Sequence, residues 1–357
     1  MSPRPLRLTF IAIALGVVSA IGLDGCDARH ASTHDLTVVG WGGSSQDAHR
    51  NAYWRSFTQQ TGIELREDVW NGGIGVLRAK VRAGNADWDV VQVEAEELLL
   101  GCAEGLFERL DWRALGGRDA FIPAAVNDCG VGAMVWSELF AYDGARVKGK
   151  SPRNWADFWD LRHFPGRRGM RKTPKYTLEA ALMADGVEPR DVYSVLSTPA
   201  GVDRAFHKLD EIKSRIVWWI TVAQVPDLLA SGEVAMSMTT PGRLILANRT
   251  NGRNFRVVWD ENIHAVDFWV ILQGSPHKTE AMQLLQYMTR PENEVRLPLF
   301  IPTGLSNKQA IAALDTPFKQ DSPSDPDNMT HSLALDARYW VENGASLTQR
   351  FNAWAAK

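Results

Sequence analysis

Four carboxylates in this sequence stand where they could hold an ammonium group. Asp267 lies in an apolar segment, and Glu94 and Glu96 follow the mostly apolar residues 88–93. A carboxylate that is shielded from water pairs strongly with a cation. Acidic residues also suit the first turn of a helix, so Glu94 and Glu96 have a structural explanation as well. Glu138 lies in another apolar run, where a structural role explains it equally well.

A candidate partner for a carboxylate group comes later in the chain. Arg243 and Thr240 follow the strand-like residues 234–238. An arginine can bind a carboxylate through two parallel hydrogen bonds, or it can place charge at the edge of a sheet. A ligand with both an amine and a carboxylate would need both kinds of residue.

Aromatic rings at predicted strand ends can cover an alkyl chain or an ammonium group. The chain has 14 Trp and 6 Tyr, and most of these rings must pack in a core. Trp41 follows the first strand, Tyr176 follows a strand at 169–172, and Trp218 and Trp219 end another. Side chains alternate along a strand, so one of this last pair should face the ligand, and we choose Trp219. Packing within its own domain is the alternative for Trp41.

No local motif of an enzyme is present. Residues 42–45, Gly-Gly-Ser-Ser, lack the second glycine of a G-x-S-x-G turn. H-E-x-x-H and C-x-x-C are absent, and no G-x-G-x-x-G follows the first strand. We therefore predict no catalytic residue, no metal and no cofactor, and a protein that binds its ligand without converting it.

Strands and helices alternate along the chain, which favours an open parallel sheet. Ligands of such sheets bind beyond the carboxyl ends of the strands. Gly42 and Gly43, after the first strand, would let backbone N–H groups approach a ligand, or they only shape a turn. Residues 315–328 are predicted to form an exposed loop. Strands are predicted at 36–39, 63–69, 88–93, 216–219, 234–238 and 264–272, and helices at 46–60, 74–83, 154–159, 202–209, 227–230, 281–288 and from residue 333 onward.

The N-terminal residues have the form of an export signal. Arg4 and Arg7 precede the apolar residues 8–22, which are too short for a membrane span. Residues 23–26, Leu-Asp-Gly-Cys, resemble a lipobox in which Cys26 is lipidated, and cleavage after Ala20 is the alternative. We expect residues 1–25 to be a signal peptide and the mature protein to be periplasmic, with a membrane anchor where Cys26 is lipidated.

Charge and cysteine content narrow the class further. The chain has 39 basic and 42 acidic side chains, a net charge of −3, and no evident basic cluster. Nucleic-acid binding therefore lacks its usual driving force, and we expect a monomer without a nucleic-acid partner.

With Cys26 lipidated, Cys102 and Cys129 remain as a pair in an oxidising compartment. We predict a disulfide between them, and two buried free thiols are the alternative.

Several short segments together resemble the substrate-binding proteins of bacterial ABC importers, in the branch related to spermidine/putrescine-binding proteins. Each segment alone is weakly specific, and their order along the chain makes the resemblance. The segments are WGG at 41–43, FTQQTGI at 57–63, WDVV at 88–91, NWADFWD at 154–160, FPGRR at 164–168, LLASGEVA at 228–235 and PTG at 302–304.

The resemblance implies an α/β, two-lobed, periplasmic-binding-protein-like (type II) fold with a hinge of crossing strands. The first lobe would hold residues 35–137 and 265–310, and the second 138–264. Residues 311–357 would form a loop and C-terminal helices that pack on the lobes. The strands would cross near 135–142 and 259–267. A ligand between the lobes would stabilise the closed form, which the ABC permease in the inner membrane would recognise.

Strand ends and the resemblance together define the expected site. Asp267 matches a position where polyamine binders of this branch carry an acidic residue. The expected ligand-binding residues are Trp41, Gly42, Gly43, Glu94, Tyr176, Trp219, Thr240, Arg243 and Asp267.

Polyamines such as putrescine and spermidine are the ligands that this branch implies, and a polyamine is our first interpretation. Polyamine binders place acidic residues where residues 171–176 here read Arg-Lys-Thr-Pro-Lys-Tyr. A second buried ammonium group without a partner is costly. The alternative is a zwitterion such as an amino acid or γ-aminobutyrate, with Asp267 or Glu94 on the amine and Arg243 on the carboxylate. A periplasmic enzyme with the same two-lobed fold is the second alternative.

Overall fold

The computed structural model describes residues 36–84 and 87–357 of the chain. The predicted signal peptide, the cleavage after Ala20 and the lipidation of Cys26 concern residues outside these described ranges. Within these ranges, no helix has both the length and the apolar character needed to cross a bilayer.

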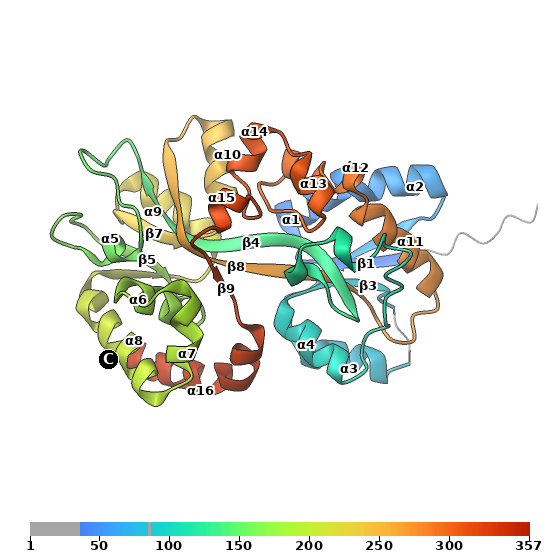
Figure 1. Cartoon of the computed structure of the whole chain (residues 1–357), viewed down its shortest axis with the longest axis horizontal. Coiled ribbons are helices and arrows are strands. Elements are labelled where there is room, and N and C mark those ends of the chain that lie inside the picture. The colour runs from blue at the N-terminus through green and yellow to red at the C-terminus, as the bar shows by residue number, and fades with distance from the viewer. Residues whose placement is uncertain (1–35, 85–86) are drawn as a thin grey trace, which may run out of the picture. The chain divides into compact units, whose positions relative to one another are not determined.

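One mixed sheet runs through the described part of the chain (Figure 1). The strand order is β2-β1-β3-β8-β4-β7-β5-β6, and β9 also pairs with β8. The strands are β1 (Leu36–Gly40), β2 (Leu65–Val69), β3 (Val90–Val93), β4 (Gly130–Asp143), β5 (Arg168–Arg171), β6 (Ile216–Trp219), β7 (Met236–Thr239), β8 (Phe255–Ile271) and β9 (Leu333–Ala334).

Helices connect most of the strands and cover the sheet (Figure 1). A π-helical turn, Arg50–Trp54, interrupts the helix predicted at 46–60 and divides it into α1 and α2. The helices are α1 (Gly43–His49), α2 (Arg55–Thr61), α3 (Ile74–Arg82), α4 (Ala95–Ala103), α5 (Trp155–Trp159), α6 (Thr177–Ala184), α7 (Val192–Leu196), α8 (Pro199–Ile212), α9 (Val225–Ser231), α10 (Pro241–Asn251), α11 (Lys278–Thr289), α12 (Pro291–Glu294), α13 (Lys308–Ala312), α14 (Thr316–Gln320), α15 (Pro326–Met329) and α16 (Ala337–Ala355).

The sheet is parallel in two groups of strands and antiparallel at its centre. β1 pairs in parallel with β2 and β3, and β5 pairs in parallel with β6 and β7. The long strands β4 and β8 run antiparallel to each other, and they join the groups through β3 and β7. The predicted parallel sheet is therefore correct within each group and wrong at the centre. Hydrophobic periodicity shows that a strand is buried, but it does not show which way the neighbouring strand runs.

Local sequence signals end or begin several elements as predicted. Gly62 ends α2 in a left-handed conformation with φ of 74°, which glycine adopts at little cost. Asn154 begins α5, where its Oδ1 accepts a 3.1 Å hydrogen bond from the Asp157 N–H. This side-chain cap satisfies an N–H group that the first helical turn leaves unpaired.

The predicted exposed loop at 315–328 is wrong in part. It contains α14 and α15, and Ser322 and Ser324 are buried. The Ser324 hydroxyl accepts a 2.9 Å hydrogen bond from the Leu305 N–H. Polar residues in this segment are thus buried because their hydrogen bonds are made within the protein.

Two hydrophobic cores lie on either side of the region where β4 and β8 run together. The first core takes β4 as far as Val135 and β8 from Val266, with buried residues of β1, β3, α4 and α11. The second takes β4 from Phe140 and β8 as far as Ile263, with buried residues of β5, β6, β7, α6, α8 and α16. We call the parts built on these cores the first lobe and the second lobe. The exact boundaries given above stay predictions.

Two links attach helices to these lobes. Cys102 of α4 and Cys129, just before β4, are joined by a disulfide with 5.7 Å between their Cα atoms. Trp340 Nε1 of α16 donates a 2.7 Å hydrogen bond to the buried Glu179 of α6. The disulfide holds α4 to the first lobe, and the hydrogen bond holds α16 to the second.

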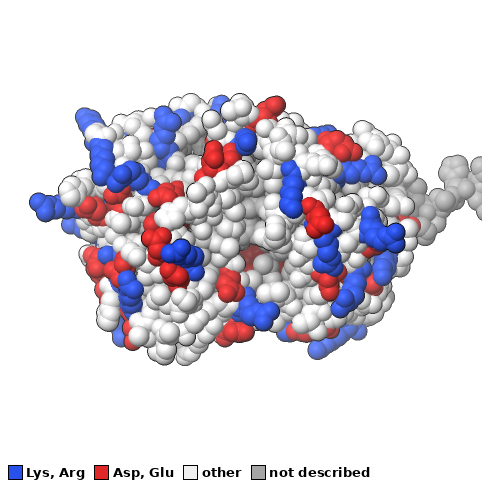
Figure 2. All heavy atoms as spheres, in the orientation of Figure 1, with Lys and Arg blue, Asp and Glu red and all other residues white. Residues whose placement is uncertain are grey.

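Charges of both signs are interspersed over the face of the molecule that Figure 2 shows. No large region of that face carries a single sign. This face therefore offers little electrostatic attraction for a polyanion.

Candidate ligand-binding site

A cavity of about 730 Å³ is lined by residues of both lobes. Its size lies in the range of pockets that hold small molecules. The lining residues that bear on ligand binding are Trp41, Ser45, Glu94, Met134, Trp136, Glu138, Arg171, Trp219, Thr240, Arg243 and Asp267.

β4 supplies a floor for this cavity through alternate residues. Met134, Trp136 and Glu138 all line the cavity, as expected for side chains on one face of a strand. Asp267 of β8 pairs with Met134 in the antiparallel register, so it lies at the first-lobe end of this row. Glu138 lies further along β4, about 13 Å from Met134 at the usual rise per residue.

Asp267 is a buried carboxylate held by nitrogen donors. Its Oδ2 accepts hydrogen bonds from Trp41 Nε1 (2.7 Å) and Gln92 Nε2 (3.1 Å), and its Oδ1 accepts one from Trp136 Nε1 (2.9 Å). Burial raises the pKa of Asp267 to about 7; nearby Glu94 adds to the rise, and the two indole N–H groups oppose it. No cation among the described residues pairs with Asp267. The donors therefore orient its charge without balancing it.

Glu138 is buried in a different way, at the junction of the two lobes. Neither of its carboxyl oxygens has a hydrogen-bond partner among residues 36–84 and 87–357. Burial raises the pKa of Glu138 to about 7, and the Arg171 guanidinium opposes this rise. Arg171 thus offsets the charge of Glu138 from a distance, without a hydrogen bond.

Two arginines of the second lobe line the cavity. Arg171 ends β5, and its guanidinium lies 5.7 Å from the centre of the Tyr176 ring. Arg243 lies in the first turn of α10 and is exposed. Neither guanidinium forms a hydrogen bond or an ion pair within the described ranges. Both present the forked N–H donors that suit a carboxylate.

An ion-pair cluster connects the lobes beside the cavity. Lys175 Nζ lies 2.8 Å from Glu96 Oε1 and 3.1 Å from Glu94 Oε2. Lys175 precedes α6 of the second lobe, whereas Glu94 and Glu96 lie at the start of α4 in the first. Burial lowers the pKa of Lys175, but the two carboxylates outweigh it and the net change is a rise. Glu94, predicted to bind the ammonium group of a ligand, is already paired with a lysine here.

Glu94 also has the structural role that its place at a helix start allowed. It is the N-cap residue of α4, and its backbone N–H donates a 3.1 Å hydrogen bond to Glu97 Oε2. This hydrogen bond satisfies an N–H group at the beginning of the helix.

Tryptophan rings form part of the cavity wall. Trp41 stacks on Trp70 with ring centroids 5.3 Å apart and 11° between the planes. Trp219 is buried, and its Nε1 has no hydrogen-bond partner in the described part of the chain. Trp218 packs instead against Phe351 of α16, edge to face. The two neighbours thus face opposite ways, with Trp219 at the cavity.

Three predicted residues are not among those that line the cavity. Gly42 and Gly43 have φ angles of 70° and 56° and begin α1, where the Gly42 N–H donates a 3.1 Å hydrogen bond to Gln46 Oε1. They shape the turn between β1 and α1. Tyr176 is buried next to Trp136, with ring centroids 5.6 Å apart. The other six predicted residues line the cavity: Trp41, Glu94, Trp219, Thr240, Arg243 and Asp267.

Sequence reasoning missed two residues for which a signal existed. Trp136 lies two residues before Glu138, so the alternation of a strand places both on one face. Arg171 ends a strand, and the strand-end rule that selected Tyr176 applies to it as well. Both residues line the cavity.

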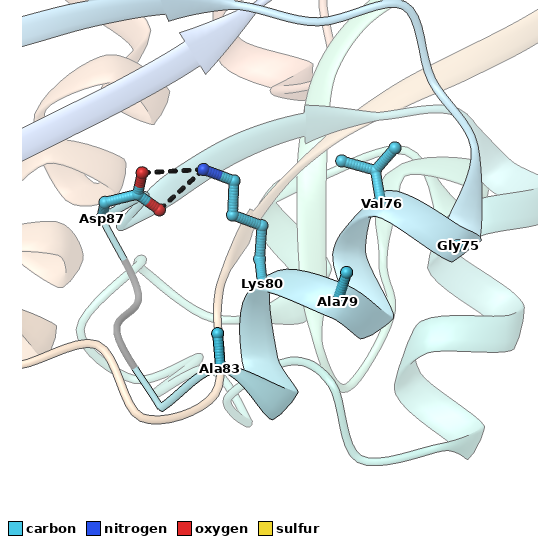
Figure 3. A pocket seen from close by; sticks show the side chains of 6 residues that line it. All are labelled: Gly75, Val76, Ala79, Lys80, Ala83 and Asp87. Carbon is cyan, nitrogen blue, oxygen red and sulfur yellow. Dashed lines mark hydrogen bonds and ion pairs between the residues drawn. The ribbon is translucent and has the colours of Figure 1, made fainter.

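A second hollow of about 700 Å³ lies over α3 (Figure 3). Lys80 and Asp87 point toward each other there, with Lys80 Nζ 2.7 Å from both carboxylate oxygens. The same ammonium group lies 4.2 Å from the centre of the Trp88 ring. The two charges satisfy each other, so this hollow does not resemble a ligand site. Within residues 36–84 and 87–357, no group of three or more His, Cys, Asp or Glu side chains is placed to hold a metal.

Known proteins resemble this chain over most of its length. A family model described as bacterial extracellular solute-binding protein matches residues 52–323. The gamma-aminobutyric acid-binding protein of Pseudomonas aeruginosa is 41% identical over 340 residues, which cover 95% of this chain and 96% of the relative. The putrescine/agmatine-binding protein of the same species is 21% identical over 337 residues, 87% and 88% of the two chains. The solved structure of the GABA receptor Atu4243 matches with a TM-score of 0.81 and 31% identity, over 90% of this chain and 98% of that one.

Proposed function

We propose that this chain, which belongs to the bacterial extracellular solute-binding proteins, binds a small zwitterion such as γ-aminobutyrate (GABA). The family and the periplasmic-binding-protein fold are those that the sequence resemblance implied. The chain is therefore an extracytoplasmic solute-binding component of an ABC importer.

The observation that carries this proposal is the separation of charge within one cavity. At the first-lobe end, Asp267 is held by three N–H groups and lacks a cation among the described residues. At the second-lobe end, Arg171 and Arg243 have no ion-pair partner in those ranges. A ligand with an amine at one end and a carboxylate at the other satisfies both.

A polyamine, our first interpretation, has less support than the zwitterion. A diamine offers no carboxylate to Arg171 and Arg243, and their positive charges would repel its second ammonium group. The GABA-binding relative is also about twice as similar in sequence as the putrescine/agmatine-binding one, at 41% against 21% identity. Both observations support the alternative that the sequence left open.

The two-lobed arrangement supports a binding cycle without a chemical step. A ligand held by Asp267 of the first lobe and Arg171 of the second stabilises the form in which the lobes are close together. A permease in the inner membrane then receives the ligand from this form. We further propose a periplasmic monomer from which residues 1–25 are cleaved, with lipidated Cys26 as its membrane anchor.

Titration calorimetry with a ligand panel tests the proposal. The panel contains glycine, β-alanine, GABA, 5-aminovalerate, butyrate and putrescine. We expect GABA to bind most tightly. Butyrate and putrescine, which each lose one charged contact, should bind at least about tenfold more weakly. Tighter binding of putrescine than of GABA would overturn the proposal.

An Arg171→Gln variant tests the contact with the ligand carboxylate separately from the contact with the ligand amine. It should weaken GABA binding about tenfold, because one charge-assisted hydrogen-bond donor is lost. It should leave putrescine binding unchanged or stronger.

NMR of the ligand recovered after binding tests for a chemical reaction. Any new product would support the second alternative, a periplasmic enzyme with the same fold.

A further inference from the structure

The cluster of Lys175, Glu94 and Glu96 is not used by the function proposed above. Glu94 lines the cavity, so without Lys175 its carboxylate would face a ligand. Lys175 Nζ lies within 3.1 Å of Glu94 and 2.8 Å of Glu96. The protein thus places a cation of its own against a carboxylate of the binding site.

Several contacts hold this ammonium group in position. Lys175 is partly buried, and its Nζ lies 5.3 Å from the centre of the Tyr176 ring. Tyr176 has a φ of 73°, a conformation that residues other than glycine rarely adopt. Such a conformation persists where the surrounding packing determines it. The segment that carries Lys175 is therefore fixed by the fold of the second lobe.

The third acidic residue nearby has a different use. Glu97 accepts hydrogen bonds from the N–H groups of Gly73 (3.0 Å) and Glu94 (3.1 Å). Its carboxylate is engaged by the backbone, whereas those of Glu94 and Glu96 receive the lysine. The charge of Glu94 toward the cavity is accordingly offset by Lys175.

We propose that Lys175 is a specificity-determining residue whose ammonium group takes the position of a second ligand cation. The cavity then accepts one ligand ammonium group, at Asp267, and rejects diamines. This inference rests on the proposed function, since it explains how a site with Glu94, Glu138 and Asp267 distinguishes a zwitterion from a polyamine.

A purely mechanical role for the ion pair makes a different prediction. If Lys175 only holds the two lobes together, its removal weakens the binding of every ligand by the same factor, because the same contact between the lobes is lost. If Lys175 occupies a cation position, its removal weakens the binding of GABA and strengthens the binding of putrescine. The ratio of the two affinities therefore separates the roles.

The test measures both affinities by titration calorimetry for the wild-type protein, Lys175→Met and Lys172→Met. Lys172 is exposed, and its side chain has no hydrogen bond, ion pair or ring contact within the described ranges, so it is a matched control for the loss of one charge. In Lys175→Met, we expect the putrescine-to-GABA affinity ratio to rise at least about tenfold, the effect of one charge-assisted hydrogen bond. Lys172→Met should keep the wild-type ratio.

Two further variants keep the result interpretable. Lys175→Arg retains the cation and should retain the preference for GABA. Adding Glu94→Gln to Lys175→Met should remove the gain in putrescine binding, because the carboxylate that receives the second ammonium group is gone. An unchanged ratio in Lys175→Met, with GABA bound by the wild-type protein, overturns this inference alone. Failure of the wild-type protein to bind GABA overturns the proposed function instead.

Discussion

Two buried carboxyl groups at the floor of the cavity, Asp267 and Glu138, show how differently one protein can treat the same chemical group. Burial raises the pKa of each to about 7. Among the described residues, Asp267 receives three N–H hydrogen bonds and no cation, whereas Glu138 receives no hydrogen bond and has the charge of Arg171 nearby. The two groups thus differ in what stabilises their charged form.

This difference indicates different roles. Fixed N–H donors orient an anion and replace part of its hydration, yet they leave its charge available to a ligand. Under the proposed function, this arrangement prepares Asp267 for an ammonium group before the ligand arrives. Glu138 is offset by a neighbouring arginine and lies where β4 passes between the lobes. Its position suits a part in the junction better than a part in holding the amine.

Exchanging Asp267 for asparagine should have the largest effect. Asp267→Asn removes the negative charge and places an NH₂ group among N–H donors. We expect GABA binding to weaken about 100-fold, the upper range for one charge-assisted hydrogen bond. Titration calorimetry at pH 8 measures this loss, and circular dichroism verifies that the variant is folded. Wild-type affinity in a folded variant would remove Asp267 from the site.

The pH dependence of binding should follow Asp267. With a pKa of about 7 in the empty protein, this carboxyl is increasingly protonated as the pH falls below 7. A protonated Asp267 cannot balance an ammonium group, so GABA affinity should fall up to about tenfold per pH unit below 7 and level off above it. Titrations between pH 5 and 8 measure this profile.

The two carboxyl groups can be separated in the same titrations. The profile should be lost in Asp267→Asn and kept in Glu138→Gln, because only Asp267 is assigned to the amine. A profile that instead disappears with Glu138→Gln would reverse the assignment of the two groups.

The smallest change in affinity is expected for Glu138→Gln, within about threefold of the wild-type protein. Its effect should appear in stability instead. The pKa of Glu138 is about 7 in the folded protein and about 4.3 when unfolded. Between these values the folded state holds a proton that the unfolded state has lost, so the free energy of unfolding falls as the pH rises to 7.

Above pH 7 the wild-type protein carries the full cost of this buried charge. Glu138→Gln should therefore raise the free energy of unfolding at pH 8 by about 1 kcal/mol. Urea denaturation at pH 5 and pH 8 measures the difference. A variant that is less stable than the wild-type protein at pH 8 would show that the charge of Glu138 supports the fold.

Local sequence patterns predicted many of the strands and helix ends, because the residues that determine them are close together in the chain. The strand at 216–219 and the glycine that ends α2 are examples, since burial and backbone conformation depend on nearby residues. The predicted strand at 264–272 is too short because β8 begins at Phe255. The first half of β8 contains Arg256, Asp260 and Glu261. It therefore lacks the continuous apolar run by which the second half of β8 was predicted.

The sequence by itself determined the family, the alternation of strands and helices, and several residues that line the cavity, Asp267 and Trp41 among them. The tertiary structure alone decided which groups meet. Lys175 reaches Glu94 and Glu96 across 81 and 79 residues of chain, and Trp41 reaches Asp267 across 226. Such partners depend on strand order and on the distance between the lobes, which no local pattern contains. The charge that a carboxylate offers to a ligand is therefore a property of the folded protein.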